Sequence, residues 1–155
     1  MNTPYLIQRL QSLDAVVARA NTFGAADPEL ASYLSAYLTV VISGVYEDCI
    51  EYLFGERSAK AGDPELAQYV KTTLDERFRN PKYGRVVETL SKFSGSYVKN
   101  LQGKVQEQAR LSLDSIVDNK NLVAHGGVPS ATLADVSQYY SNAKAVLDAL
   151  EQVLA

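Results

Sequence analysis

Four of the five prolines in this 155-residue chain directly follow a residue whose side chain can cap a helix. Such a side chain accepts hydrogen bonds from the free backbone amides of a first helical turn. Proline suits the next position, because the hydrogen that its nitrogen lacks has no partner in that turn. Each pair therefore predicts the start of a helix. The four pairs are Thr3-Pro4, Asp27-Pro28, Asp63-Pro64 and Asn80-Pro81.

The segments between these starts carry apolar residues at helical spacing and lack the dense β-branched alternation of strands. The second segment is apolar on most sides, which is typical of a central helix packed by its neighbours or by a second copy of the chain. The pattern predicts an all-α bundle of five to six helices, forming a single domain over residues 1–155. The expected helices span 4–21, 28–54, 64–78, 81–94, 104–118 and 132–154, with a short element near 97–101.

Length and composition favour one globular domain in the cytoplasm. Apolar residues make up 46% of the chain, enough for a real core, and no apolar run approaches the roughly 20 residues that cross a bilayer. The first residues lack a basic start, an apolar stretch and a cleavage site, so no secretion signal is expected. The lone Cys49 cannot form a disulfide within the chain.

The formal net charge of −3 argues against a general nucleic-acid coat protein, but it permits an enzyme that touches a few phosphates in one cleft. Residues 77–104 nevertheless contain seven Lys or Arg and one acid, Glu88. This segment is either an ordinary solvated face or a surface that steers a polyanion toward a nearby site. Its possible RNA-binding residues are Arg77, Arg79, Lys82 and Arg85.

Most reaction classes lack their motifs here. One histidine and one cysteine cannot build a His/Cys zinc cluster within a chain, and no glycine-rich phosphate loop, GxSxG or HExxH is present. No metal and no cofactor are therefore expected. Cys49 lies in the most apolar predicted helix, where a thiolate is disfavoured. His125 and its surroundings remain as the candidate site.

Lys120 and His125 stand five positions apart. On a continuous helix they would diverge, but a bend beginning at residues 119–121 would let both point into one cleft. There, the imidazole would move protons to or from the attacking or leaving oxygen of RNA. The cation would stabilise the charge that gathers on the phosphorane-like transition state. For an isolated histidine, a capping or core role at a helix end is the ordinary interpretation.

Three segments resemble one known family. NKNLVAHG (119–126) resembles the HEPN signature (higher eukaryotes and prokaryotes nucleotide-binding), in which Arg-Asn is followed by three residues and then His. SGVYEDCIEYLF (43–54) and FRNPKYGRVVETLSKF (78–93) resemble two helix patterns of its RiboL-PSP-HEPN subgroup. The similarity covers roughly residues 33–127.

The resemblance implies a homodimeric ribonuclease, often a toxin or phage-defence effector, whose cleft takes its basic residue and histidine from two copies. His125 would then transfer protons, and Asn121 would shape the loop or contact the phosphate, with Asn119 in support. Glu47 or Asp48 would match the acid of the long helix and orient the basic motif residue. The implied partners are RNA, a second copy and, for a toxin, an antitoxin protein.

The departure from the family pattern is Lys120, where the signature has arginine. Lysine keeps the charge but loses the planar two-pronged contact with phosphate oxygens, so cleavage would be weakened or lost. It is either the residue of a natural divergent member or an engineered change. Arg110, upstream on the preceding helix, is one candidate to replace the missing guanidinium. The alternative function is a catalytically inactive HEPN dimer that binds nucleotide or a partner protein.

Overall fold

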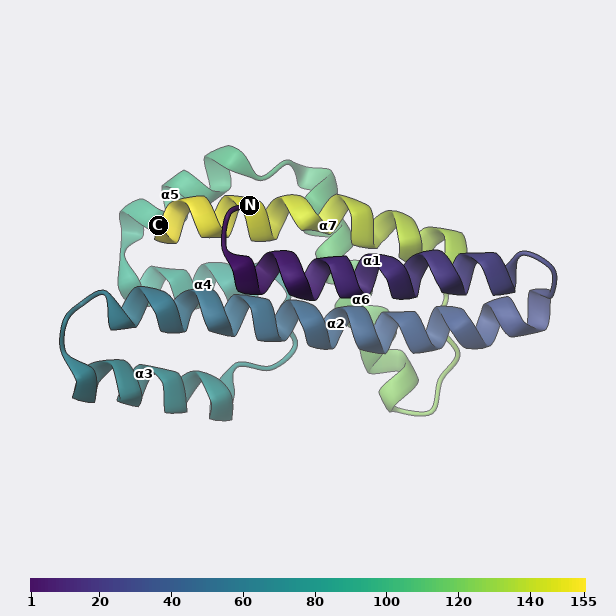
Figure 1. The fold of residues 1–155 in the computed structure, drawn as a ribbon, viewed down its shortest axis with the longest axis horizontal. Helices are drawn as coiled ribbons and strands as arrows, with labels where there is room; N and C mark the ends of the chain where they lie inside the picture. Colours follow the sequence, from purple (N-terminus) through teal and green to yellow (C-terminus); the bar gives the residue numbers. More distant parts are fainter.

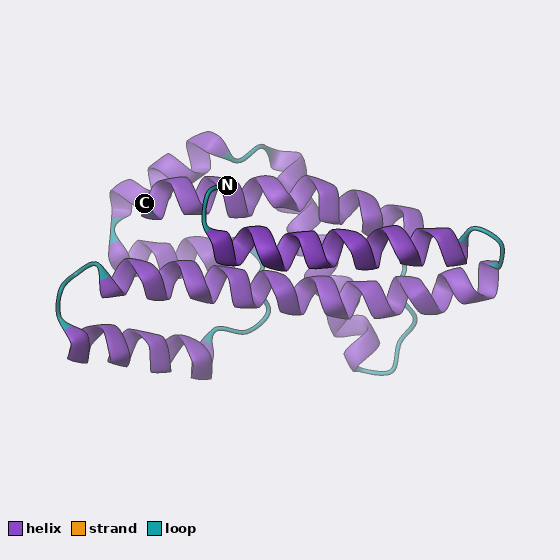
Figure 2. Cartoon of the chain, in the orientation of Figure 1, coloured by secondary structure: helices purple, strands orange, loops and turns teal.

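The computed structural model describes all 155 residues, and it contains seven helices and no strand (Figure 1, Figure 2). The all-α prediction is confirmed, whereas the number of helices is seven and not five to six. The helices are α1 (Pro4–Gly24), α2 (Pro28–Ala59), α3 (Pro64–Arg77), α4 (Tyr83–Phe93), α5 (Gly95–Lys104), α6 (Glu107–Ala124) and α7 (Leu133–Leu154).

The additional helix is α5, which begins where the sequence predicts a turn followed by a short element. The Ser94 side-chain oxygen accepts a hydrogen bond from the backbone N–H of Ser96 at 3.2 Å. Ser94 therefore caps α5. Ser94 both ends α4 and begins α5, so the two helices are joined directly without a longer loop.

Two of the four predicted helix starts have the expected capping geometry. The carboxylates of Asp27 and Asp63 each accept two backbone N–H groups from the first turn of α2 and α3. Thr3 precedes α1 as predicted, but its side chain makes no capping hydrogen bond. At Asn80 the helix begins later than predicted, at Tyr83.

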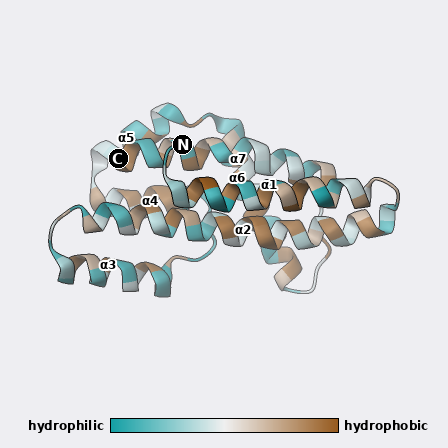
Figure 3. Cartoon of the chain, in the orientation of Figure 1, coloured by the Kyte–Doolittle hydropathy of each residue, from teal (hydrophilic) through white to brown (hydrophobic).

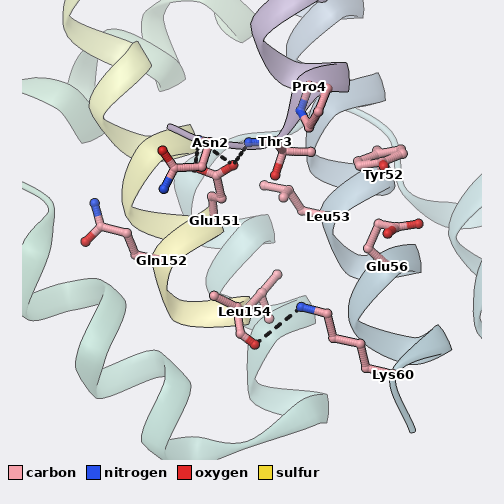
Figure 4. A pocket seen from close by; sticks show the side chains of 11 residues that line it. Asn2, Thr3, Pro4, Tyr52, Leu53, Glu56, Lys60, Glu151, Gln152 and Leu154 are labelled. Atoms are coloured by element: carbon pink, nitrogen blue, oxygen red, sulfur yellow. Dashed lines mark hydrogen bonds between the residues drawn. The ribbon is translucent and has the colours of Figure 1, made fainter. Parts of the chain in front are cut away.

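Glu151 of α7 holds the residues that precede α1 (Figure 4). Its carboxylate accepts the backbone N–H groups of Asn2 at 2.9 Å and Thr3 at 2.6 Å. Burial would raise the pKa of Glu151, but the hydrogen bonds from Thr3 and Asn2 outweigh it and hold that pKa below its ordinary value. The Met1 amine also contacts Asp148 at 2.5 Å, so both ends of the chain are tied to each other.

Helix α2 is the centre of the bundle and packs against α1, α3, α6 and α7 (Figure 1). It continues past Gly55 to Ala59, five residues beyond the predicted end, and the connection to α3 contains Gly62 at φ +79°. One buried cluster receives hydrophobic residues from all seven helices. Figure 3 shows hydrophobic residues along the packed stretches of α1 and α2, and also on the last turns of α6. No helix has the length and apolar content needed to span a membrane.

Candidate functional site

Helix α6 carries the motif, and it runs without interruption to Ala124. The predicted bend at residues 119–121 is therefore wrong. Successive helical residues turn by about 100°, so side chains five positions apart point about 140° away from each other. Lys120 and His125 of one chain consequently lie on different sides of α6. One copy alone does not direct both side chains into the same cleft.

The two glycines after His125 end the helix. Gly126 has φ +80°, and its N–H donates to the Val123 carbonyl at 3.0 Å. The N–H of Gly127 donates to the Leu122 carbonyl at 2.9 Å. This pair of bonds is the Schellman arrangement, which requires a residue in the left-handed region. The glycines of the motif thus set the helix end, and they leave the His125 side chain exposed to solvent.

Lys120 contacts a residue forty positions earlier in the chain. Its ammonium donates to the side-chain oxygen of Asn80 at 2.9 Å. Asn80 is the only non-glycine residue with positive φ, at +55°. Its amide does not cap α4, since the first N–H of that helix, on Tyr83, donates to Asp114 at 2.7 Å. The side chain predicted to start a helix is instead a ligand of the motif lysine.

Glu47 of α2 holds Asn80 from the other side. Its carboxylate accepts the Asn80 backbone N–H at 2.9 Å, and its other oxygen lies 3.4 Å from a guanidinium nitrogen of Arg79. A second acid, Glu51, lies 3.3 Å from the same nitrogen. Burial and the neighbouring Glu47 raise the pKa of Glu51 to about 7. We call Glu47, Arg79, Asn80 and Lys120 the α2–α6 network.

The sequence left open whether Glu47 or Asp48 is the relevant acid. Asp48 forms an ion pair with Arg9 of α1, away from the motif. Adjacent residues of a helix point about 100° apart, so the two acids serve different neighbours. Only Glu47 belongs to the α2–α6 network.

The two motif asparagines have different environments. Asn119 is buried; its amide nitrogen donates to the Ser115 carbonyl at 2.9 Å, and its oxygen accepts the backbone N–H of Ala131 at 3.2 Å. It therefore ties the segment before α7 to α6. Asn121 is half-buried, and its backbone carbonyl accepts the N–H of His125 at 3.1 Å.

The four predicted RNA-binding residues divide into two pairs. On the motif side, Arg79 is neutralised by Glu47 and Glu51, and Lys82 lies 2.5 Å from Asp118. Arg77 and Arg85 instead line a pocket between α3 and α4. The basic segment is thus not one continuous face.

Two further sequence alternatives are resolved by contacts. Arg110 donates to the carbonyls of Val105 and Gln102 at the end of α5 and lies over the Tyr83 ring. Its guanidinium is committed to structure and does not replace the motif arginine. Cys49 is fully buried, and burial raises the pKa of its thiol to about 12, which disfavours a nucleophilic thiolate.

Exposed hydrophobic side chains flank the motif. Leu122 and Val128, on either side of His125, are 44% and 73% exposed. On α2, Tyr33, Tyr37 and Val40 are exposed at helical spacing, one to two turns apart on the face that continues to Glu47. We call these three residues the α2 stripe. Large exposed apolar patches are a mark of interaction surfaces.

Sequence analysis missed the role of Asn80, because a capping interpretation accounted for it. The signal in the sequence is the string FRNP, which resembles a family pattern. Nothing local in the sequence pairs Asn80 with Lys120.

Comparison with known proteins gives one match. The sequence profile of the family described as RiboL-PSP-HEPN matches residues 5–155, which contain the α2–α6 network and the motif. No curated protein and no solved structure matches the chain. The profile spans nearly the whole chain and extends the predicted similarity beyond residues 33–127. The chain belongs to the RiboL-PSP-HEPN family.

Proposed function

We propose that this protein is a metal-independent endoribonuclease that acts as a homodimer. Membership in a HEPN family suggests a nuclease or RNA-related function. The observation that carries the proposal is the state of Lys120. Its ammonium is held by a neutral amide, whereas the nearby Arg79 and Lys82 are neutralised by carboxylates. Lys120 is thus positioned and keeps its full charge for a phosphate.

The reaction needs only groups of the chain and of RNA. The 2′-hydroxyl attacks the adjacent phosphorus as its proton leaves to a base, and the bond from phosphorus to the 5′-oxygen breaks as that oxygen gains a proton. The products are a 2′,3′-cyclic phosphate and a 5′-hydroxyl. The exposed imidazole of His125 performs the proton transfer, and Lys120 stabilises the negative charge on the phosphorane-like transition state. Asn121 contacts the phosphate or shapes the approach.

A homodimer supplies what a single chain lacks. In one copy, Lys120 and His125 point to different sides of α6, so a shared cleft takes the lysine of one copy and the histidine of the other. The exposed Leu122 and Val128 beside the motif, with the α2 stripe, provide apolar surface for an isologous two-fold contact. Two copies also double the positive charge at the cleft, so an acidic chain can hold RNA there.

The biological role we propose is that of a toxin or phage-defence effector, with an antitoxin as the second protein partner where the chain is a toxin. This role rests on the HEPN resemblance of the motif, and its readout is growth arrest on expression of the chain but not of His125→Ala.

A second candidate function is an inactive HEPN dimer that binds nucleotide or protein. The lysine at position 120 favours it, since an ammonium lacks the planar fork of arginine and binds phosphate less specifically. Both candidates share the dimer and differ in chemistry.

The deciding experiment incubates the purified protein with labelled total RNA and a tRNA pool in EDTA, beside His125→Ala and a control, Lys99→Ala. Lys99 is an exposed cation on α5, outside the network. We expect cleavage by the protein and by the control, 2′,3′-cyclic phosphate ends, and none by His125→Ala. Cleavage that survives in His125→Ala would move the chemistry elsewhere. Silence from a folded dimer, and from its Lys120→Arg form, would favour the binding module.

A further inference from the structure

A second basic site lies away from the motif. Helix α3 packs beside the end of α2, on the side away from α1 in Figure 1, and a pocket of about 710 Å³ opens between it and α4 and α5. Leu74, Phe78 and Phe93 line its apolar part. This volume is in the range of small-ligand sites. Five cations line the pocket and no acid does: Arg57, Lys60, Arg77, Arg85 and Lys92.

The positive charge of this pocket is only partly compensated. Glu88 is the one acidic side chain that forms ion pairs with the lining cations, at 2.7 Å from Arg85 and 3.2 Å from Lys92. The Arg77 guanidinium forms no ion pair, in contrast to Arg79 two residues later. Cations in a concave, partly apolar site attract anions more strongly than the same charges on a convex surface.

Aromatic side chains accompany the cations. Tyr69 of α3 lines the pocket and is 69% exposed, so its ring is accessible to a ligand. The Arg57 guanidinium lies 5.5 Å above the centre of the Tyr97 ring, also in the lining. Cations interleaved with exposed aromatic rings are the combination that single-stranded nucleic acids bind, through phosphates and stacked bases.

The pocket and the motif share one connecting segment. An Arg85 nitrogen donates to the Arg77 carbonyl at 3.1 Å, which closes residues 77–85 into a loop. Within this loop, Asn80 contacts Lys120, whereas Arg77 and Arg85 face the pocket. The motif lysine and the pocket are therefore linked through one short segment of the chain.

We propose that this pocket binds an unpaired nucleotide of the RNA strand that the motif cleaves. Its base stacks on Tyr69, and its phosphate binds Arg77, whose guanidinium forms no ion pair. That the strand is a substrate rests on the function proposed above; that the pocket holds a nucleotide does not.

The test measures binding of a fluorescein-labelled 2′-O-methyl single strand, which lacks the attacking hydroxyl and is not cut. Arg77→Ala and Tyr69→Ala remove exposed side chains, so the fold is retained, as circular dichroism checks. Lys71→Ala is the matched control, since Lys71 is exposed on α3 and lines a different depression. Fluorescence anisotropy is read over a series of salt concentrations.

We expect Arg77→Ala and Tyr69→Ala each to weaken binding on the order of tenfold, and Lys71→Ala to leave it unchanged. Arg77→Ala reduces the slope of the logarithm of the binding constant against the logarithm of the salt concentration by about 0.7 per lost phosphate contact. Tyr69→Ala leaves this slope unchanged. Equal binding by all variants, or no binding by the parent, would overturn the proposal. So would equal competition by poly-glutamate, which carries charge without bases.

Failure of this proposal is distinguishable from failure of the proposed function. If the protein cleaves RNA and the pocket variants bind with unchanged affinity, the pocket proposal is wrong and the nuclease proposal stands. If Arg77→Ala and Tyr69→Ala weaken binding but the protein cleaves no RNA, the pocket proposal stands and the nuclease proposal is wrong.

Discussion

The ammonium of Lys120 lies 2.9 Å from the side-chain oxygen of Asn80, a residue forty positions earlier in the chain. Asn80 is in turn held through its backbone N–H by Glu47 at 2.9 Å. The carboxylate thus acts on the lysine through a neutral amide, which orients the cation without cancelling its charge. A direct pair between Glu47 and Lys120 would orient it equally well but would compete with phosphate.

Lys120→Arg should raise RNA cleavage by about tenfold, equivalent to about 1.4 kcal/mol of transition-state stabilisation. The planar guanidinium adds a second, parallel hydrogen bond to a phosphate oxygen. Initial cleavage rates in EDTA, with Lys99→Arg as the matched control on α5, measure the effect. Equal rates for Lys120→Arg and the parent would mean that this position is not the phosphate clamp.

Asn80→Gly should lower cleavage by about tenfold while the fold is retained. Glycine adopts the φ of +55° without strain and keeps the backbone N–H that Glu47 accepts, so only the contact with Lys120 is removed. Asn80→Ala should show the same loss of rate and, compared with Asn80→Gly, a lower unfolding free energy by about 1 kcal/mol, because alanine has a Cβ and lacks the local polar contacts by which asparagine tolerates positive φ. Cleavage rates with urea unfolding curves separate the two effects. An unchanged rate in Asn80→Gly would show that Lys120 needs no positioning.

Tyr37→Glu should convert the dimer to a monomer at micromolar concentration and abolish cleavage. Tyr37 is 54% exposed in the middle of the α2 stripe, and a charge there would be buried in the proposed two-fold contact. Light scattering after size-exclusion chromatography gives the mass. Tyr69→Glu, at another exposed tyrosine on α3, should leave the mass unchanged. A strict monomer already in the parent protein would contradict the shared cleft.

Glu51→Gln should stabilise the protein increasingly as pH rises. The pKa of Glu51 is raised from 4.5 to about 7 in the folded chain, so the folded state holds more protons than the unfolded state between these values. Its contribution to stability therefore falls as pH rises through this window. Glutamine does not titrate, so Glu51→Gln does not lose this stability as pH rises. Urea unfolding at pH 5 and pH 8 should show a small difference at pH 5 and a larger one at pH 8; a constant difference would place the titration elsewhere.

The helix starts show how far local sequence reaches. Asp27 and Asp63 cap α2 and α3 as predicted, because an aspartate before proline has its partners within the next three residues. Thr3 makes no capping hydrogen bond, and Glu151 from the far end of the chain instead holds the backbone N–H groups of Asn2 and Thr3, which precede α1. The end of α2 and the start of α5 also differ from the prediction, since α2 continues past Gly55 to Ala59 and Ser94 caps α5 directly after α4.

The sequence by itself determined the all-α class, the family and the motif residues Lys120 and His125. These features depend on residue types at fixed short spacing within a single helix, so they can be recognised without knowing how the helices pack. Only the tertiary structure decided that Glu47 and not Asp48 serves the motif, that Asn80 holds Lys120, and that Arg77 and Arg79 face different sites. The reason is that α2, the 77–85 loop and α6 meet only when the core packs, and the helical period then turns adjacent side chains toward different neighbours.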